Sequence, residues 1–100
     1  MSQSVRNFTP GGTVSLAVTS SSGNVAMASS PSSRKDIMIY NSGSEAVFIK
    51  FGNSAVTAAT TDMPIPAGAW GVFHAGDTTH VAGISASGNL TLYATTGFGN

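Results

Sequence analysis

Residues 40–54, YNSGSEAVFIKFGNS, contain a turn signal, a short apolar run and a second turn signal. Side chains alternate between the two faces of a strand, so Val47, Ile49 and Phe51 should share one face. The opposite face then carries Phe48, although a strand at the surface of a small protein normally keeps one polar face. The fold must therefore bury one face of this strand and cover at least part of the other.

Alternation with a period of two recurs along the chain, whereas no window has the apolar spacing of a helix. Turn signals rich in Gly, Ser, Asn and Asp separate the alternating segments, and residues 20–24 read as a hairpin loop. The number and spacing of the segments predict an all-β, single-domain antiparallel β-sandwich, jelly-roll-like, with about seven to eight short strands. The expected strands lie near residues 13–19, 24–28, 36–41, 46–51, 69–74, 79–85 and 89–95.

The ends of the chain differ from this pattern and define the expected domain organisation. Residues 1–12 should form an N-terminal arm, residues 13–96 the sandwich domain and residues 97–100 a C-terminal tail. The first dozen residues, MSQSVRNFTPGG, lack the apolar segment of a secretory signal. No apolar run approaches the roughly 20 residues of a membrane-spanning helix, so we expect no membrane partner.

One face of each strand should contribute to the core. A register displaced by one residue would instead bury Phe48 and expose Val47. In the connection TTDMPIPAG, the prolines favour extended neighbours, so Ile65 should enter the core and Gly68 can supply a positive φ. An exposed binding loop is the alternative for this connection. The expected core residues are Val14, Leu16, Val18, Ile37, Ile39, Val47, Ile49, Phe51, Val72, Ile84, Leu90 and Leu92.

Charge is unusually scarce in this sequence. Charged residues make up 8% of the chain and the formal net charge is zero, against about 25% charged residues in a typical domain. The four cations provide no basic stripe, so we expect no nucleic-acid partner. A net charge near zero promotes association. With no cysteine for disulfides or thiolate metal sites, the composition suits a subunit of an assembly.

The second face of the central strand requires a cover. Either the N-terminal arm folds over it or a neighbouring subunit does, while scattered exposed apolar residues are the ordinary alternative. The expected interface residues are Val5, Phe8, Phe48 and Trp70. We therefore expect a homo-oligomer, with a trimer as the expected form.

The sequence HAGDTTH brings together His74, Asp77 and His80, which could face one another across a hairpin loop. Two imidazoles and a carboxylate can bind zinc or another divalent ion. Gly-Asp is also ordinary turn chemistry, and this interpretation is preferred, so we expect no metal and no cofactor. These three residues remain the candidates if a metal binds.

Catalytic motifs are missing from the sequence. No serine lies in a G-x-S-x-G elbow between a strand and a helix. The four carboxylates fall at expected turns or strand ends, and no two are placed for acid–base work. We therefore expect that the protein is not an enzyme. The carboxylates are Asp36, Glu45, Asp62 and Asp77.

The segments YNSGSEAVFIKFGNSAVTA, MPIPAGAWGVFHAG and THVAGISASGNLTLYATTGFG follow one another between residues 40 and 99. Their order resembles a recurrent type of small tailed-bacteriophage protein, and the resemblance covers about residues 37–99. The resemblance implies a virion structural component with a β-sandwich fold, assembled in the host cytoplasm. The shared motifs are turn and core residues, and no catalytic residue comes with them.

Three functions are compatible with this resemblance. The first is a capsid decoration (cement) protein that binds the major capsid protein or another virion protein and stabilises the head shell. The second is a structural protein of the tail, neck or fibre. The third is a carbohydrate- or host-surface-binding module, for which Trp70 and Tyr93 are the candidate platforms.

Overall fold

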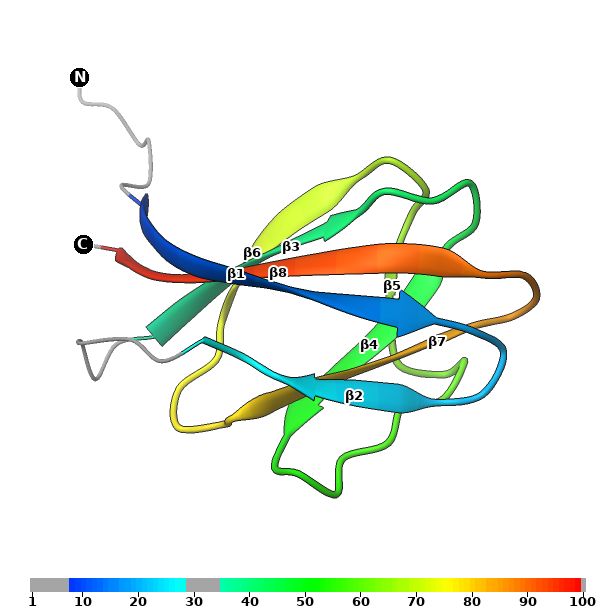
Figure 1. Cartoon of the computed structure of the whole chain (residues 1–100), viewed down its shortest axis with the longest axis horizontal. Coiled ribbons are helices and arrows are strands. Elements are labelled where there is room, and N and C mark those ends of the chain that lie inside the picture. Colours follow the sequence, from blue (N-terminus) through cyan, green and yellow to red (C-terminus); the bar gives the residue numbers. More distant parts are fainter. Residues whose placement is uncertain (1–7, 29–34, 100) are drawn as a thin grey trace.

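A computed structural model of the chain describes residues 8–28 and 35–99, and its regular structure is entirely β (Figure 1). The predicted all-β sandwich is confirmed. None of the described residues forms a helix long and apolar enough to cross a membrane. The strands are β1 (Phe8–Val18), β2 (Gly23–Ala26), β3 (Lys35–Asn41), β4 (Val47–Gly52), β5 (Met63–Ile65), β6 (Trp70–His74), β7 (His80–Ser85) and β8 (Leu90–Gly99).

The strands form two four-stranded sheets with the order β1-β8-β3-β6 in one and β2-β7-β4-β5 in the other. All neighbouring strands are antiparallel. Among the described strands, only β4 and β5 follow each other within one sheet, and every other connection crosses between the sheets. This connectivity is that of a jelly roll. The expected hairpin at residues 20–24 is therefore wrong, since β1 pairs with β8 and β2 with β7.

The strand boundaries extend beyond the expected sandwich domain. Phe8, Thr9 and Pro10 pair with Gly99, Phe98 and Gly97, so residues 8–12 belong to β1 and residues 97–99 to β8. The short strand β5 was expected only as an extended segment. The remaining part of the expected arm, residues 1–7 with Val5, lies outside the described residues.

The core lies between the two sheets and matches most of the expected residues. The rings of Phe51 from β4 and Phe73 from β6 meet across the sandwich, with centroids 5.9 Å apart. Val14, Leu16 and Phe51 pack against the core while partly buried. Val18, Ile37, Ile39, Val47, Ile49, Leu90 and Leu92 are buried, and so is Ile65, as expected.

Two expected core residues point outward instead. Val72 pairs with Met38 on the outer face of its sheet, which leaves Phe73 to face the core. Ile84 pairs with Phe48 on the outer face of the other sheet. Both errors are one-residue register errors, which exchange the two faces of a strand. On β4 the expected register is confirmed, because Val47 is buried completely.

Asn41 at the end of β3 ties the two sheets together. Its side-chain amide donates to the carbonyl oxygens of Glu45, Ile65 and Pro66 at 2.7, 3.0 and 3.3 Å. Its Oδ1 accepts a hydrogen bond from the amide of Gly43 at 2.9 Å. Asn41 is fully buried, so these bonds satisfy polar groups that water cannot reach. The N-x-G sequence at residues 41–43 is thus a structural element of the sandwich.

Two glycines of the shared motifs are required by geometry. A Cβ atom on Gly43 would collide with the Cβ of Leu90, so the turn after β3 can approach β8 only without a side chain. Gly68 has a φ of 72°, which confirms the expected positive φ before β6. A side chain would strain the backbone there.

The connection between β4 and β5 covers the outer face of its own sheet. The outward side chain of Asn24 on β2 donates to the carbonyls of Ser54 and Val56, both at 3.1 Å. Ala82, which pairs with Asn24 on the same face, is completely buried beneath this layer. Residues 53–62, here called the covering loop, therefore cover this face beside β2, whereas Phe48 on the same face remains half-buried.

Candidate functional site

The outer face of the β1-β8-β3-β6 sheet carries a row of three aromatic side chains. Tyr40 on β3 pairs with Trp70 on β6 at one side and with Tyr93 on β8 at the other. The strand register thus places the three residues side by side across three adjacent strands. We call them the aromatic row. They are 41%, 62% and 40% exposed, respectively.

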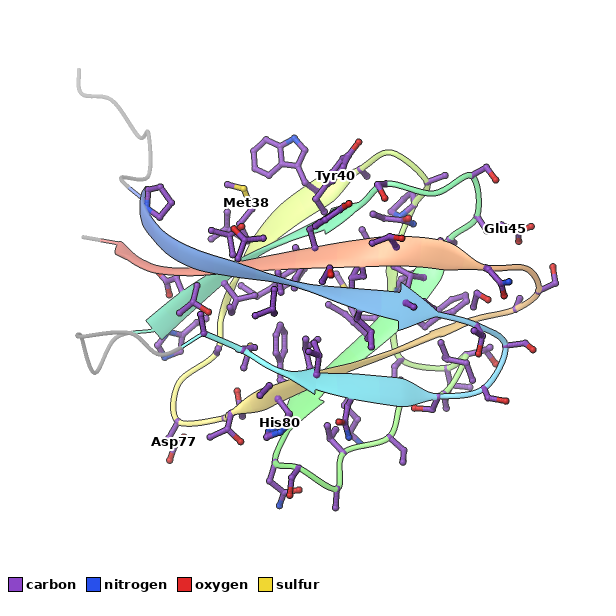
Figure 2. The ribbon with its side chains drawn as sticks, viewed as in Figure 1. Met38, Tyr40, Glu45, Asp77 and His80 are labelled. Atoms are coloured by element: carbon purple, nitrogen blue, oxygen red, sulfur yellow. The ribbon has the colours of Figure 1, made fainter. Side chains whose placement is uncertain are left out.

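Tyr40 points away from the sandwich (Figure 2), in the same direction as Met38. The rings of Tyr40 and Tyr93 are stacked, with centroids 6.4 Å apart and planes inclined by 22°. Neighbouring strands lie about 4.8 Å apart, so this offset stack follows the spacing of the strands. Trp70 continues the row to β6, the edge strand of the sheet.

Hydroxyl-bearing side chains flank the aromatic row on β1 and β8. Ser15 pairs with Tyr93 and extends the row to β1. In the next row, Thr13 and Thr95 share a hydrogen bond of 2.8 Å between their Oγ1 atoms. Beyond Thr95, that second row continues with the apolar side chains of Met38 and Val72. The face therefore combines exposed rings with neutral hydroxyl groups.

The polar atoms of the aromatic row are available to a ligand. Neither the two phenol hydroxyls nor the indole N–H bonds to any described residue. Tyr and Trp normally satisfy these groups with a partner when they are buried. Within residues 8–28 and 35–99 no pocket is present, so any ligand of this face would lie across a flat sheet.

The structure separates the three candidate metal ligands. His74 ends β6 in one sheet and His80 begins β7 in the other, so the expected hairpin geometry is wrong. Nδ1 of His74 contacts Oδ1 of Asp36 at 3.2 Å, and Nδ1 of His80 contacts the hydroxyl of Thr79 at 2.8 Å. Figure 2 shows Asp77 in the connection that leads to His80. The described residues contain no cluster of three metal-binding side chains.

The expected interface residues have different positions. Trp70 is the most exposed member of the aromatic row. Phe48 is half-buried on the outer face of the other sheet, between Ile84 and Pro64. Val5 and the side chain of Phe8 lie outside the described residues. Of the two candidates whose side chains are described, Trp70 is therefore the one on an uncovered face.

The sequence predicts Trp70 and Tyr93 as candidate platforms but does not single out Tyr40, which joins them. The available signal was the alternation in DIMIYN, which places Tyr40 on the outer face with Met38. The missing information was the pairing of β3 with both β6 and β8. That pairing joins segments separated by about thirty and fifty residues, and no local pattern records it.

Comparisons with known proteins give little further information. No protein-family model matches the chain, and no curated protein matches it. One solved structure is similar, described as "Bacillus endospore appendages form a novel family of disulfide-linked pili". The similarity has a TM-score of 0.49 at 13% sequence identity and covers 98% of this chain and 93% of that chain. A similarity at this level carries no argument about function.

Proposed function

We propose that this protein is a structural, non-enzymatic component of a bacteriophage virion. In the preferred form it is a capsid decoration protein that binds the major capsid protein and stabilises the head shell. It assembles in the host cytoplasm as a homo-oligomer, with a trimer as the expected form. A position in the tail, neck or fibre is the alternative within the same class.

The observation that carries this proposal is the role of the residues that resemble the phage proteins. Asn41 and Gly43 form the turn that joins the sheets, Ile65 enters the core and Gly68 adopts the positive φ. The resembling segments thus coincide with the framework of a jelly roll, a fold found in viral capsid domains. A fold alone does not determine a function, so the sequence resemblance carries the assignment to a virion.

The surface composition supports a role in an assembly. With 8% charged residues and a formal net charge of zero, separate copies have little electrostatic repulsion to keep them apart. The covering loop is held against one outer face by hydrogen bonds from Asn24. A compact domain of this kind suits repeated placement on a larger particle.

The experiment that tests the proposal is quantitative mass spectrometry of purified particles that contain this chain. A copy number that scales with the major capsid protein supports the decoration role. A copy number that matches tail proteins moves the assignment to the tail, neck or fibre. Absence of the chain from particles whose genome encodes it contradicts the proposal.

A second experiment separates the oligomer from the location. Light scattering on the purified protein at tens of micromolar should give the mass of an oligomer, because particle symmetry favours multivalent attachment. A stable monomer at that concentration contradicts the oligomeric part of the proposal. The copy-number measurement would still decide the virion part.

A further inference from the structure

The aromatic row is exposed, and Trp70 is its one member among the expected interface residues. We propose that the aromatic row, formed by Tyr40, Trp70 and Tyr93, is a binding site for an extended, uncharged carbohydrate chain. The ligand would lie across β6, β3 and β8, with its sugar rings on the side-chain rings. This site is a property of the isolated protein and does not depend on the virion assignment.

The kind of aromatic residue is the first argument. The chain has one tryptophan and two tyrosines, and all three belong to the aromatic row. The phenylalanines with described side chains, Phe48, Phe51 and Phe73, are half-buried elsewhere. Among the described side chains, the exposed aromatic rings on this face all bear a polar group. Such rings suit a ligand that presents both C–H faces and hydroxyl groups, as sugars do.

The charge of the face is the second argument. Along the aromatic row and the row through Thr95 and Met38, the described side chains carry no charge. Asp36 and His74 lie beyond them at the far end of β3 and β6. No described cation on these rows would attract a phosphate or a carboxylate. The complementary ligand is therefore neutral.

The size of the exposed apolar surface is the third argument. Tyr and Trp bury about 150–250 Å² each when fully enclosed. At the observed exposures the three residues offer roughly 200–350 Å² in total. A stable protein partner needs about 800 Å² on each side. Here the surrounding positions hold hydroxyl side chains such as Ser15 and Thr95, so the area fits a small ligand better than a second copy.

The shape of the site is the fourth argument. Because the described part of the chain has no pocket, the face cannot enclose a compact molecule. The rings of Tyr40 and Tyr93 have centroids 6.4 Å apart, a spacing of the same order as the length of one hexose unit. A chain of two or three hexoses would place successive rings over Trp70, Tyr40 and Tyr93. The hydroxyls of Ser15, Thr13 and Thr95 are positioned to form hydrogen bonds with the part of the sugar chain that extends beyond Tyr93.

Trp70 makes the test direct, since it is the single tryptophan of the chain. Its fluorescence should be measured during titration with hexamers of β-1,4-linked glucose, α-1,4-linked glucose and β-1,4-linked N-acetylglucosamine. We expect at least one of them to shift the emission in a saturable way at up to millimolar concentration. An oligomer of galacturonic acid, which is anionic, should cause no shift. Absence of a response to every neutral hexamer overturns the proposal.

Variants distinguish the aromatic row from other surfaces. Tyr40→Ala and Tyr93→Ala should each weaken binding at least tenfold by Trp70 fluorescence, and Trp70→Ala should do so by calorimetry. Met63→Ala is the matched control, because Met63 is 53% exposed on the other sheet. It should leave binding unchanged. Each variant must keep the far-ultraviolet circular dichroism of the parent.

Two further outcomes contradict the proposal. Equal weakening by Met63→Ala would show that binding does not use this face. A Trp70 emission that shifts with protein concentration alone, together with a rise in mass by light scattering, would identify the face as a contact between copies. The copy-number test of the virion role is unaffected by either result.

Discussion

The side-chain amide of Asn41 donates a hydrogen bond of 3.0 Å to the backbone carbonyl of Ile65, 24 residues further along the chain. Asn41 ends β3 in one sheet and Ile65 ends β5 in the other. Both residues are buried. One side chain therefore fixes the relative position of the two sheets at this end of the sandwich.

Replacement of Asn41 tests this link. Asn41→Ala should lower the free energy of unfolding by about 1–3 kcal/mol, because buried carbonyls lose their donor. Urea denaturation monitored by circular dichroism gives the value. Ser44→Ala, an exposed position in the same turn, is the control and should change stability by less than about 0.5 kcal/mol. An equal loss of stability in the two variants would show that Asn41 does not link the two sheets.

Isoleucines on the two faces of the β2-β7-β4-β5 sheet should contribute differently to the free energy of unfolding. Ile49 is 2% exposed in the core, so Ile49→Ala should cost about 2–5 kcal/mol of unfolding free energy. Ile84 is half-buried on the outer face, so Ile84→Ala should cost clearly less. Denaturant titrations of both variants provide the comparison. A larger loss for Ile84→Ala would place the core on the other face of the sheet.

The two histidines should be dispensable for folding. His74→Ala combined with His80→Ala should leave oligomeric mass and the thermal midpoint close to those of the parent, since the imidazoles lie in different sheets. Light scattering and thermal denaturation are measured with and without zinc and with a chelator. Loss of assembly in the double variant, together with dependence of the parent on added zinc, would instead establish a metal site.

The N-terminal segment should act in attachment and not in folding. Deletion of residues 1–7 leaves all of β1 in place, because that strand begins at Phe8. We expect an unchanged circular dichroism spectrum and weaker binding to particles that lack the protein. The measurement is the occupancy of added protein after sedimentation of the particles. Full occupancy by the shortened chain would exclude this role for the segment.

The alternation of side chains was sufficient to predict strands, because it depends only on neighbouring residues. It located the apolar face of β4, while the prolines on either side of Ile65 predicted the burial of that residue. On β6, however, Gly71 contributes no side chain, so the pattern around Val72 and Phe73 fitted either face. On β7, the small residues Ala82 and Gly83 left Ile84 equally ambiguous.

The partners of the strands could not be predicted, since pairing in this fold joins distant segments. Local turn signals favoured hairpins at residues 20–24 and between His74 and His80, whereas both connections cross between the sheets. The same limitation hid the aromatic row, whose members come from three strands. The position of the covering loop beside β2 was also missed, because Asn24 holds that loop through backbone carbonyls, which any sequence supplies.

The pairing of β1 with β8 has a consequence for synthesis of the protein. Val18 pairs with Leu90 and Phe8 with Gly99, so β1 has no partner until nearly all of these residues have left the ribosome. At about 5–20 residues per second, one hundred residues require roughly 5–20 s. During this interval a long, uncharged strand is exposed to other nascent chains, which favours aggregation. Early access of the nascent chain to chaperones should therefore raise the yield of folded protein.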